Sequence, residues 1–166
     1  GPVYYRLGKD DTYGLPGLNG AFQLGSAQCL REGKDVCLIS LGALAREAHD
    51  ACLKLEAEGI RARHVVVSSF EPFPADMIIE QISDVSLAVV AEAHVPAGGL
   101  GERVAAMIAE NGLNCRLLHC HAGRGWDGRS GSLAFCLERE GLTGAAIASA
   151  IRDRLQNMTV RGNSNA

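Results

Sequence analysis

The sequence lacks any pair of cysteines spaced as C-x-x-C, although six cysteines occur among its 166 residues. It therefore offers neither a zinc ribbon nor a thioredoxin-type redox motif. Cys37, Cys52 and Cys115 stand within apolar patterns, where a free cysteine acts as a small buried hydrophobe. We expect reduced, structural thiols, as in a cytoplasmic protein.

An excess of positive charge and a long apolar run are also missing. The net charge is −3, which argues against a surface that binds nucleic acid. No segment approaches the roughly 18 consecutive apolar residues that indicate a membrane-spanning helix. The N-terminus has no charged region followed by an apolar segment, so we expect no secretory signal and no membrane association.

The first 20 residues differ in character from the rest of the chain. They are rich in tyrosine and glycine and show no helical period. The pattern predicts one short strand, at residues 3–7, followed by an irregular linker. We expect this segment to be the end of a preceding domain rather than part of the domain that follows.

From residue 21 onward, apolar strands alternate with amphipathic helices. The pattern predicts strands at 21–31, 35–42, 62–70, 85–93 and 114–122, and helices at 43–57, 74–84, 99–110, 132–140 and 144–156. The first of these strands reads as an edge strand, and residues 158–166 as a frayed, disordered tail. This alternation predicts an α/β fold of three layers over 21–157, with a largely parallel sheet between helices.

The segment "AEAHVPAGGLGERVAAMI", residues 91–108, joins a strand to a helix through a glycine-rich turn. Such a turn can hold an anion at the start of the helix. However, Gly98, Gly99 and Gly101 have the spacing G-G-x-G rather than G-x-G-x-x-G, and Glu102-Arg103 stands where a P-loop has lysine followed by Ser or Thr. We favour glycines that let the strand and the helix approach closely.

Two groups of polar residues stand at strand ends, where open α/β sheets bind ligands. Glu92 and His94 could transfer protons, but no nucleophile lies near them in the sequence, which favours packing or a subunit contact. His119 and His121 share one face of a strand, but two histidines make an incomplete zinc site. The sequence therefore predicts no metal site and no catalytic residue.

The loop at 123–131, "GRGWDGRSG", also follows a strand. Arg124 and Arg129 could bind a carboxylate, a phosphate or a partner, or could pair with Asp127. Lys9, the other candidate for anion contact, stands beside two aspartates, where a lysine is usually a solvated surface charge.

Four segments in order, "GPVYYRLGK", "REGKDVCLISLGALAREAHDACLKLEAEGI", "AEAHVPAGGLGERVA" and "EGLTGAAIASAI", together resemble the C-terminal end of the transketolase family. The form of the glycine-rich turn is most similar to split transketolases, in which two polypeptides share the enzyme. The resemblance implies a five-stranded mixed sheet with one antiparallel edge strand, which suits 21–31. Residues 1–20 would be the last strand of the pyrimidine-binding domain plus a linker, and 21–157 the transketolase C-terminal domain.

In that family, the complete enzyme transfers a two-carbon ketol unit between sugar phosphates with thiamine diphosphate and a divalent metal such as Mg²⁺. The family's cofactor site needs a Gly-Asp-Gly motif, which is missing from this sequence. The resemblance therefore implies that this chain alone binds no cofactor and is inactive. Its role would be assembly with the remaining thiamine-binding domains or an N-terminal subunit, in a homodimer or heterotetramer.

The resemblance also assigns a role to one residue and leaves alternatives open. Lys9 occupies the position at which the family often has an arginine that contacts the substrate phosphate. The β subunits of 2-oxo-acid dehydrogenases and deoxyxylulose-phosphate synthase resemble the sequence less closely than split transketolases do. A regulatory module that binds a phosphate or a nucleotide, through the glycine-rich turn or the Arg124 and Arg129 loop, is a further alternative.

Overall fold

The computed structural model describes residues 1–4, 14–123 and 128–163. Within these residues, five strands form one sheet in the order β1-β3-β2-β4-β5. The strands are β1 (Ala27–Arg31), β2 (Val36–Leu41), β3 (Ala62–Val67), β4 (Leu87–Glu92) and β5 (Arg116–His121). β1 pairs antiparallel with β3, and the other pairs are parallel. The predicted mixed sheet with one antiparallel edge strand is confirmed.

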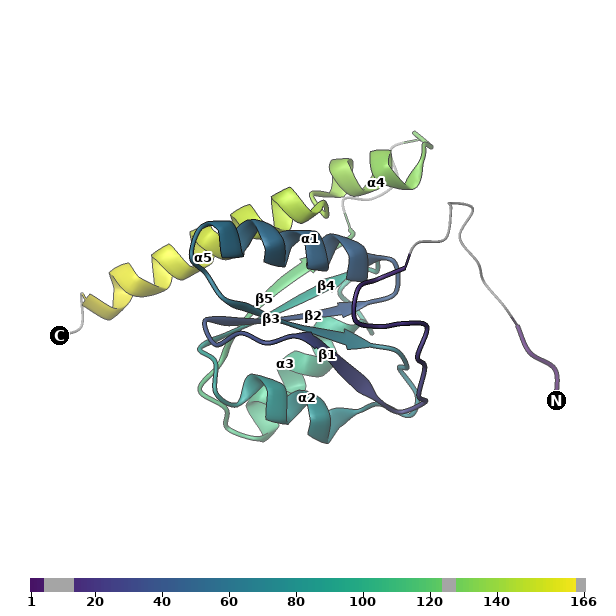
Figure 1. Cartoon of the computed structure of the whole chain (residues 1–166), viewed down its shortest axis with the longest axis horizontal. Helices are drawn as coiled ribbons and strands as arrows, with labels where there is room; N and C mark the ends of the chain where they lie inside the picture. Colours follow the sequence, from purple (N-terminus) through teal and green to yellow (C-terminus); the bar gives the residue numbers. More distant parts are fainter. Residues whose placement is uncertain (5–13, 124–127, 164–166) are drawn as a thin grey trace.

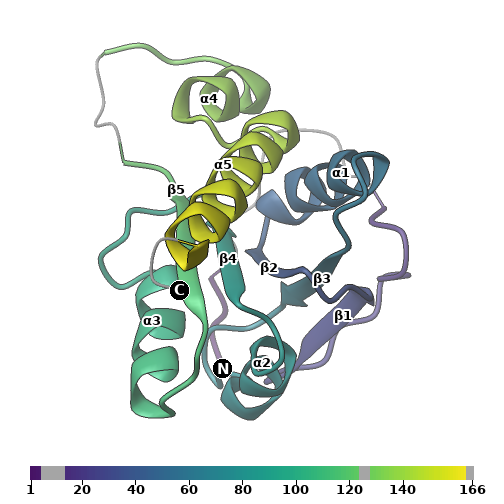
Figure 2. The same cartoon turned by 90° about the vertical axis from the view of Figure 1, so that its left-hand side faces the viewer.

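Helices cover both faces of this sheet and complete the three layers (Figures 1 and 2). In the described part of the chain they are α1 (Leu44–Ala57), α2 (Ala75–Ile82), α3 (Leu100–Glu110), α4 (Leu133–Glu140) and α5 (Gly144–Asn163). α1 and α5 pack on one face, and α2 and α3 pack on the other. α4 lies beyond the sheet, at the end where α5 begins.

The inner strands are apolar because both of their faces are covered. Every residue of β3 and β4 is buried, and only the last residue of β2 is partly exposed. Successive side chains point to opposite faces, so Leu38 and Val89 contact the α1 and α5 layer, whereas Ile39 and Val90 contact the α2 and α3 layer. The sheet therefore separates two hydrophobic cores.

One polar pair lies inside the first of these cores. Ser40 of β2 and His64 of β3 are both fully buried, and the Ser40 hydroxyl lies 2.8 Å from Nε2 of His64. Burial, together with smaller contributions from the nearby His49 and Arg31, lowers the pKa of His64 to about 4. His64 is therefore held as a neutral imidazole in the folded protein.

Two elements differ most in length from those predicted, whereas the others differ by three residues or fewer at either end. The edge strand begins at Ala27 rather than at 21, because the chain turns at Gly25, which has a φ of +74° and donates its amide to the Ser69 hydroxyl at 2.8 Å. The last helix continues to Asn163, past its predicted end at 156 and into the predicted tail. There the Thr159 hydroxyl donates to the Leu155 carbonyl oxygen, and Met158 packs against the core.

The described start of the chain, residues 1–4, contains no strand. Val3 and Tyr4 lie outside any strand, and the rest of the predicted strand at 3–7 falls outside the described residues. All six cysteines are unpaired, and Cys37, Cys52 and Cys115 are buried as expected. Across the described ranges, no helix has the length and apolar character needed to span a membrane.

Candidate functional site

The corner between β4 and α3 is built around one buried carboxylate. Glu92 is the last residue of β4, and only 1% of its surface is exposed. Its carboxylate accepts the amide of Leu100 at 2.8 Å and the amide of Gly101 at 2.9 Å. These amides lie in the first turn of α3, where backbone donors have no partner within the helix. The negative charge also matches the positive end of the helix dipole.

A histidine of the neighbouring strand completes this arrangement. His119 of β5 donates through Nε2 to Oε1 of Glu92 at 2.7 Å, so the carboxylate joins β4, β5 and α3. His94, two residues after Glu92, is the histidine that the sequence offers for a proton-transfer pair, although a packing or subunit contact is favoured for both residues. In the structure His94 is exposed, and its Nδ1 lies 2.6 Å from the carbonyl oxygen of Val95. The two residues named as a pair are therefore not brought together.

Each glycine of this turn is needed for a different structural reason. A Cβ on Gly99 would lie 2.6 Å from Oε1 of Glu92, and a Cβ on Gly101 would lie 2.2 Å from the His119 ring. Gly98 has a φ of +72°, a conformation that side chains disfavour. Two of the three glycines thus make room for the carboxylate and the imidazole, and the third allows the turn. This is the close approach favoured from the sequence.

The two histidines of β5 lie side by side on one face, as strand alternation predicts. Their ring centroids are 4.7 Å apart, and Nδ1 of His121 lies 2.9 Å from the Ala122 carbonyl oxygen. Over residues 1–4, 14–123 and 128–163, no group of three or more His, Cys, Asp or Glu side chains is arranged to hold a metal ion. The imidazole of His119 is committed to Glu92.

The other candidates for anion binding are Lys9 and the loop that carries Arg124 and Arg129, in which Asp127 is a candidate ion-pair partner. Lys9, Arg124 and Asp127 lie outside the described residues. Arg129 is described and exposed, in the stretch that leads to α4.

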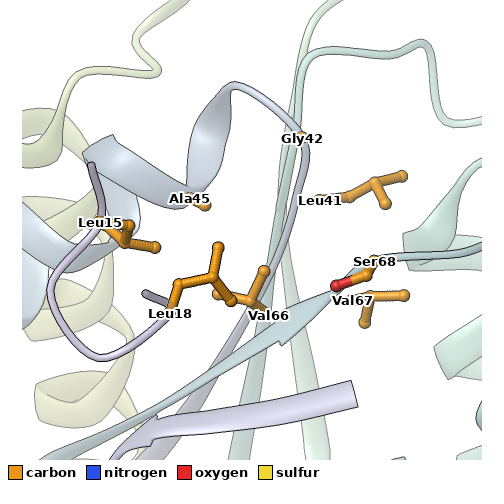
Figure 3. Close-up of a pocket in the computed structure, with 8 residues that line it drawn as sticks. All are labelled: Leu15, Leu18, Leu41, Gly42, Ala45, Val66, Val67 and Ser68. Carbon is orange, nitrogen blue, oxygen red and sulfur yellow. The ribbon is translucent and has the colours of Figure 1, made fainter. Parts of the chain in front are cut away.

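A pocket that the sequence did not reveal opens at the carboxyl ends of β2 and β3. Figure 3 shows it between the linker, the first turn of α1 and the ends of the two strands, and its volume is about 310 Å³. Among the described residues that line it, only one side chain is polar and none is charged. The lining residues are Leu15, Leu18, Leu41, Gly42, Ala45, Val66, Val67 and Ser68.

The structure is a three-layer α/β domain in which the hydrogen bonds of Glu92 join β4 to the following helix, α3. The family model described as "Transketolase, C-terminal domain" matches residues 25–147, and the chain belongs to this family. The chain is similar to a putative transketolase C-terminal section from Methanocaldococcus jannaschii, at 34% identity over 158 residues, covering 94% of this chain and 49% of that protein.

Other relatives include a transketolase subunit and a 1-deoxy-D-xylulose-5-phosphate synthase. A 6-deoxy-6-sulfo-D-fructose transketolase subunit from Clostridium sp. is 31% identical over 162 residues, covering 97% of this chain and 49% of that subunit. A 1-deoxy-D-xylulose-5-phosphate synthase from Heliobacterium modesticaldum is 32% identical over 130 residues, covering 78% of this chain and 20% of that enzyme. The chain thus spans half or less of the length of these relatives.

A solved structure has the same fold. A split-gene transketolase, described as an inactive beta4 tetramer, superposes with a TM-score of 0.73 at 31% sequence identity. The match covers 81% of this chain and 44% of that one.

Proposed function

We propose that this chain provides the third, C-terminal domain of a thiamine-diphosphate-dependent transketolase-type enzyme, and that its role there is assembly rather than chemistry. The complete enzyme would transfer a two-carbon ketol unit between sugar phosphates. The observation that carries the assembly role is the state of Glu92. This buried carboxylate at the ligand-binding edge of the sheet already has three hydrogen-bond donors, from Leu100, Gly101 and His119.

A general acid or base needs access to the proton that it transfers. Glu92 is almost fully buried, and both of its oxygens accept hydrogen bonds that hold α3 and β5 in place. His119 is the only side chain among its three partners, and its ring packs over the glycine that follows Leu100. This geometry supports a structural role for Glu92 and His119 at the carboxyl edge of the sheet.

Neither the Glu92 corner nor the pocket at β2 and β3, as the described residues form them, fits thiamine diphosphate and Mg²⁺. A diphosphate needs cationic side chains or a cluster of free amides, and Mg²⁺ needs carboxylate and carbonyl oxygens. The pocket at β2 and β3 has no charged lining residue, and the carboxylate of Glu92 is already engaged. We place cofactor binding in the remaining thiamine-binding domains or in an N-terminal subunit, which would join this domain in a homodimer or heterotetramer.

The test is a reconstitution with the cofactor-binding polypeptide. This chain alone should give no heat when titrated with thiamine diphosphate plus Mg²⁺, or with ribose 5-phosphate. Adding the cofactor-binding polypeptide should yield a complex on gel filtration and ketol transfer in a coupled assay. Heat from the cofactor with this chain alone would overturn the assembly role. Heat from ribose 5-phosphate alone would instead favour a regulatory phosphate-binding module, with the Arg129 loop as the first place to mutate.

Three finer assignments belong to the complete enzyme. Lys9 would contact the substrate phosphate, so Lys9→Met should raise KM about tenfold with little change in kcat, as expected when a charged hydrogen bond is lost. Arg124 and Arg129 would contact an anion or the partner, and Glu92, His94 and the glycine turn would lie at a structural or subunit contact. An unaltered KM in Lys9→Met would remove the phosphate assignment. A cytoplasmic location fits the six unpaired cysteines.

A second candidate reaction follows from one of the relatives. Similarity to 1-deoxy-D-xylulose-5-phosphate synthase supports the formation of that sugar phosphate by the complete enzyme. Product analysis of the reconstituted enzyme distinguishes the two, because ketol transfer forms a different sugar phosphate.

A further inference from the structure

The pocket at the ends of β2 and β3 lies where α/β sheets bind their ligands. β2 leads into α1 on one face, whereas its neighbour β3 leads into α2 on the opposite face. In open α/β sheets, ligands bind outside the carboxyl ends of the strands near such a divergence. The pocket is lined by the end of β2 at Leu41 and Gly42, and it is independent of the Glu92 corner.

We propose that this pocket binds an uncharged, mainly apolar small molecule of one or two fused rings, with one polar group hydrogen-bonded to the Ser68 hydroxyl. The lining sets the polarity of the ligand. Leu15, Leu18 and Val66 provide aliphatic walls, and Ser68 carries the one side-chain oxygen drawn among the lining residues (Figure 3). A charged ligand would lose its hydration without gaining an ionic partner.

The volume sets the size of the ligand. An engineered protein cavity of about 150 Å³ lined by apolar side chains binds benzene. The pocket, at about 310 Å³, has roughly twice that volume and reaches the lower limit of typical ligand sites. One ring would leave part of the space unfilled, and two fused rings would occupy it.

Small residues keep the pocket open on the side of α1. Ala45 lies in the first turn of the helix and is 6% exposed, so its methyl group faces the interior. An added Cβ on Gly42 would meet no atom within 4 Å, and the residue has a φ of +61°. A larger side chain at position 45 would occupy the space that the ligand needs.

The opposite wall belongs to the segment that precedes the sheet. Leu15 packs with Ala45 and Val66 in a small hydrophobic cluster, to which Leu18 also contributes. The pocket is thus a space between this segment and the sheet that is partly open to solvent. This arrangement favours a small molecule over a strand or helix of a partner protein.

Indole is the probe that we would use, because it has two fused rings, no charge and one N–H donor. Titration of the complete chain, followed by calorimetry and by methyl NMR, should show saturable binding with a dissociation constant below about 1 mM. The methyl signals of Leu15, Leu18 and Val66 should shift. Indole-3-acetate, which adds a negative charge, should bind at least tenfold more weakly.

Variants locate the site and provide the control. Ala45→Leu should weaken indole binding at least tenfold because the added atoms fill the pocket, and Ser68→Ala should weaken it about threefold to tenfold. Ala57→Leu, the same substitution at the exposed end of α1, should bind like the unmodified chain. Circular dichroism checks that each variant is folded. If Ala45→Leu fails to fold, Ser68→Ala still tests the site, because it removes only one oxygen atom.

Three results would overturn the proposal. They are no saturable binding of indole up to 1 mM, methyl shifts confined to residues outside the pocket, and equal binding of indole-3-acetate. If indole does not bind and Ala45→Leu instead weakens the complex with the cofactor-binding polypeptide, the pocket receives a side chain of that partner.

Discussion

Replacing Glu92 by Gln tests whether the buried carboxylate holds the β4–α3 corner together. The side chain keeps its size, but one oxygen becomes an NH₂ group that faces donors. Glu92 accepts two backbone amides and the imidazole of His119, so the variant leaves at least one buried donor without an acceptor. Hydrogen bonds to charged groups contribute about 1.5–3 kcal/mol, and a buried orphan donor costs about 1–3 kcal/mol. We expect a loss of about 3 kcal/mol in the free energy of unfolding.

The assay is urea unfolding followed by circular dichroism, with linear extrapolation to water. Glu102→Gln is the matched control, because this carboxylate also accepts a backbone amide at the same corner, from Gly98 at 2.9 Å, but is exposed. We expect the control to lose less than about 0.5 kcal/mol. Equal losses in the two variants would refute the reasoning. A Glu92→Gln chain of normal stability that abolished ketol transfer after reconstitution would show that Glu92 has a chemical role.

Three further predictions use the same unfolding assay. Gly101→Ala places a Cβ against the His119 ring and should cost about 2 kcal/mol, and unchanged stability would contradict the close packing. His64 has its pKa lowered to about 4 by burial, so the unfolded chain, near 6.5, takes up a proton first as the pH falls. The free energy of unfolding is therefore highest above pH 6.5 and falls toward pH 4. The fall between pH 8 and pH 5 should be about 2 kcal/mol. This loss should be absent in His64→Asn and retained in His94→Asn. Arg103→Gln removes a guanidinium 4.1 Å from the Phe73 ring centroid and should cost about 1 kcal/mol, whereas no loss would exclude a stabilising contact.

Most of the fold could be predicted because it depends on local periodicity. The apolar runs that became β2, β3 and β4 are buried on both faces, and the α1 helix ends just before Gly59, at the predicted place. The start of β1 could not be predicted, because Phe22 and Leu24 continue the apolar pattern although the chain has not yet joined the sheet. Only the turn at Gly25 and its bond to a residue 44 positions away set the true start.

The corner could be predicted only in part, because its contacts cross between strands. The glycine-rich turn is a local feature, so the close approach of strand and helix could be predicted from its three glycines. The partner of Glu92, however, is 27 residues distant, and the choice of His119 over His94 depends on strand order and register. The alternation of β5 places both His119 and His121 on the same face as Glu92, and His121 is the direct register partner of Glu92. Knowing that β4 and β5 are neighbours would therefore have left these two histidines as candidates, and only the side-chain geometry selects His119. The pocket joins three separate segments, and no single motif reveals it.

The reversed direction of β1 decides where the preceding part of the chain meets the domain. Ala27 pairs with Val67, at the carboxyl end of β3, so the chain enters the sheet at that edge and runs toward the opposite one. A parallel β1 would have brought the same entry point to the far edge, about 17 Å away for a strand of this length. Because β1 is inverted, the chain enters at the carboxyl edge of the parallel strands. Leu15, the pocket and the Glu92 corner therefore all lie at this one edge. The other end is left to the short turns that return each helix to the sheet.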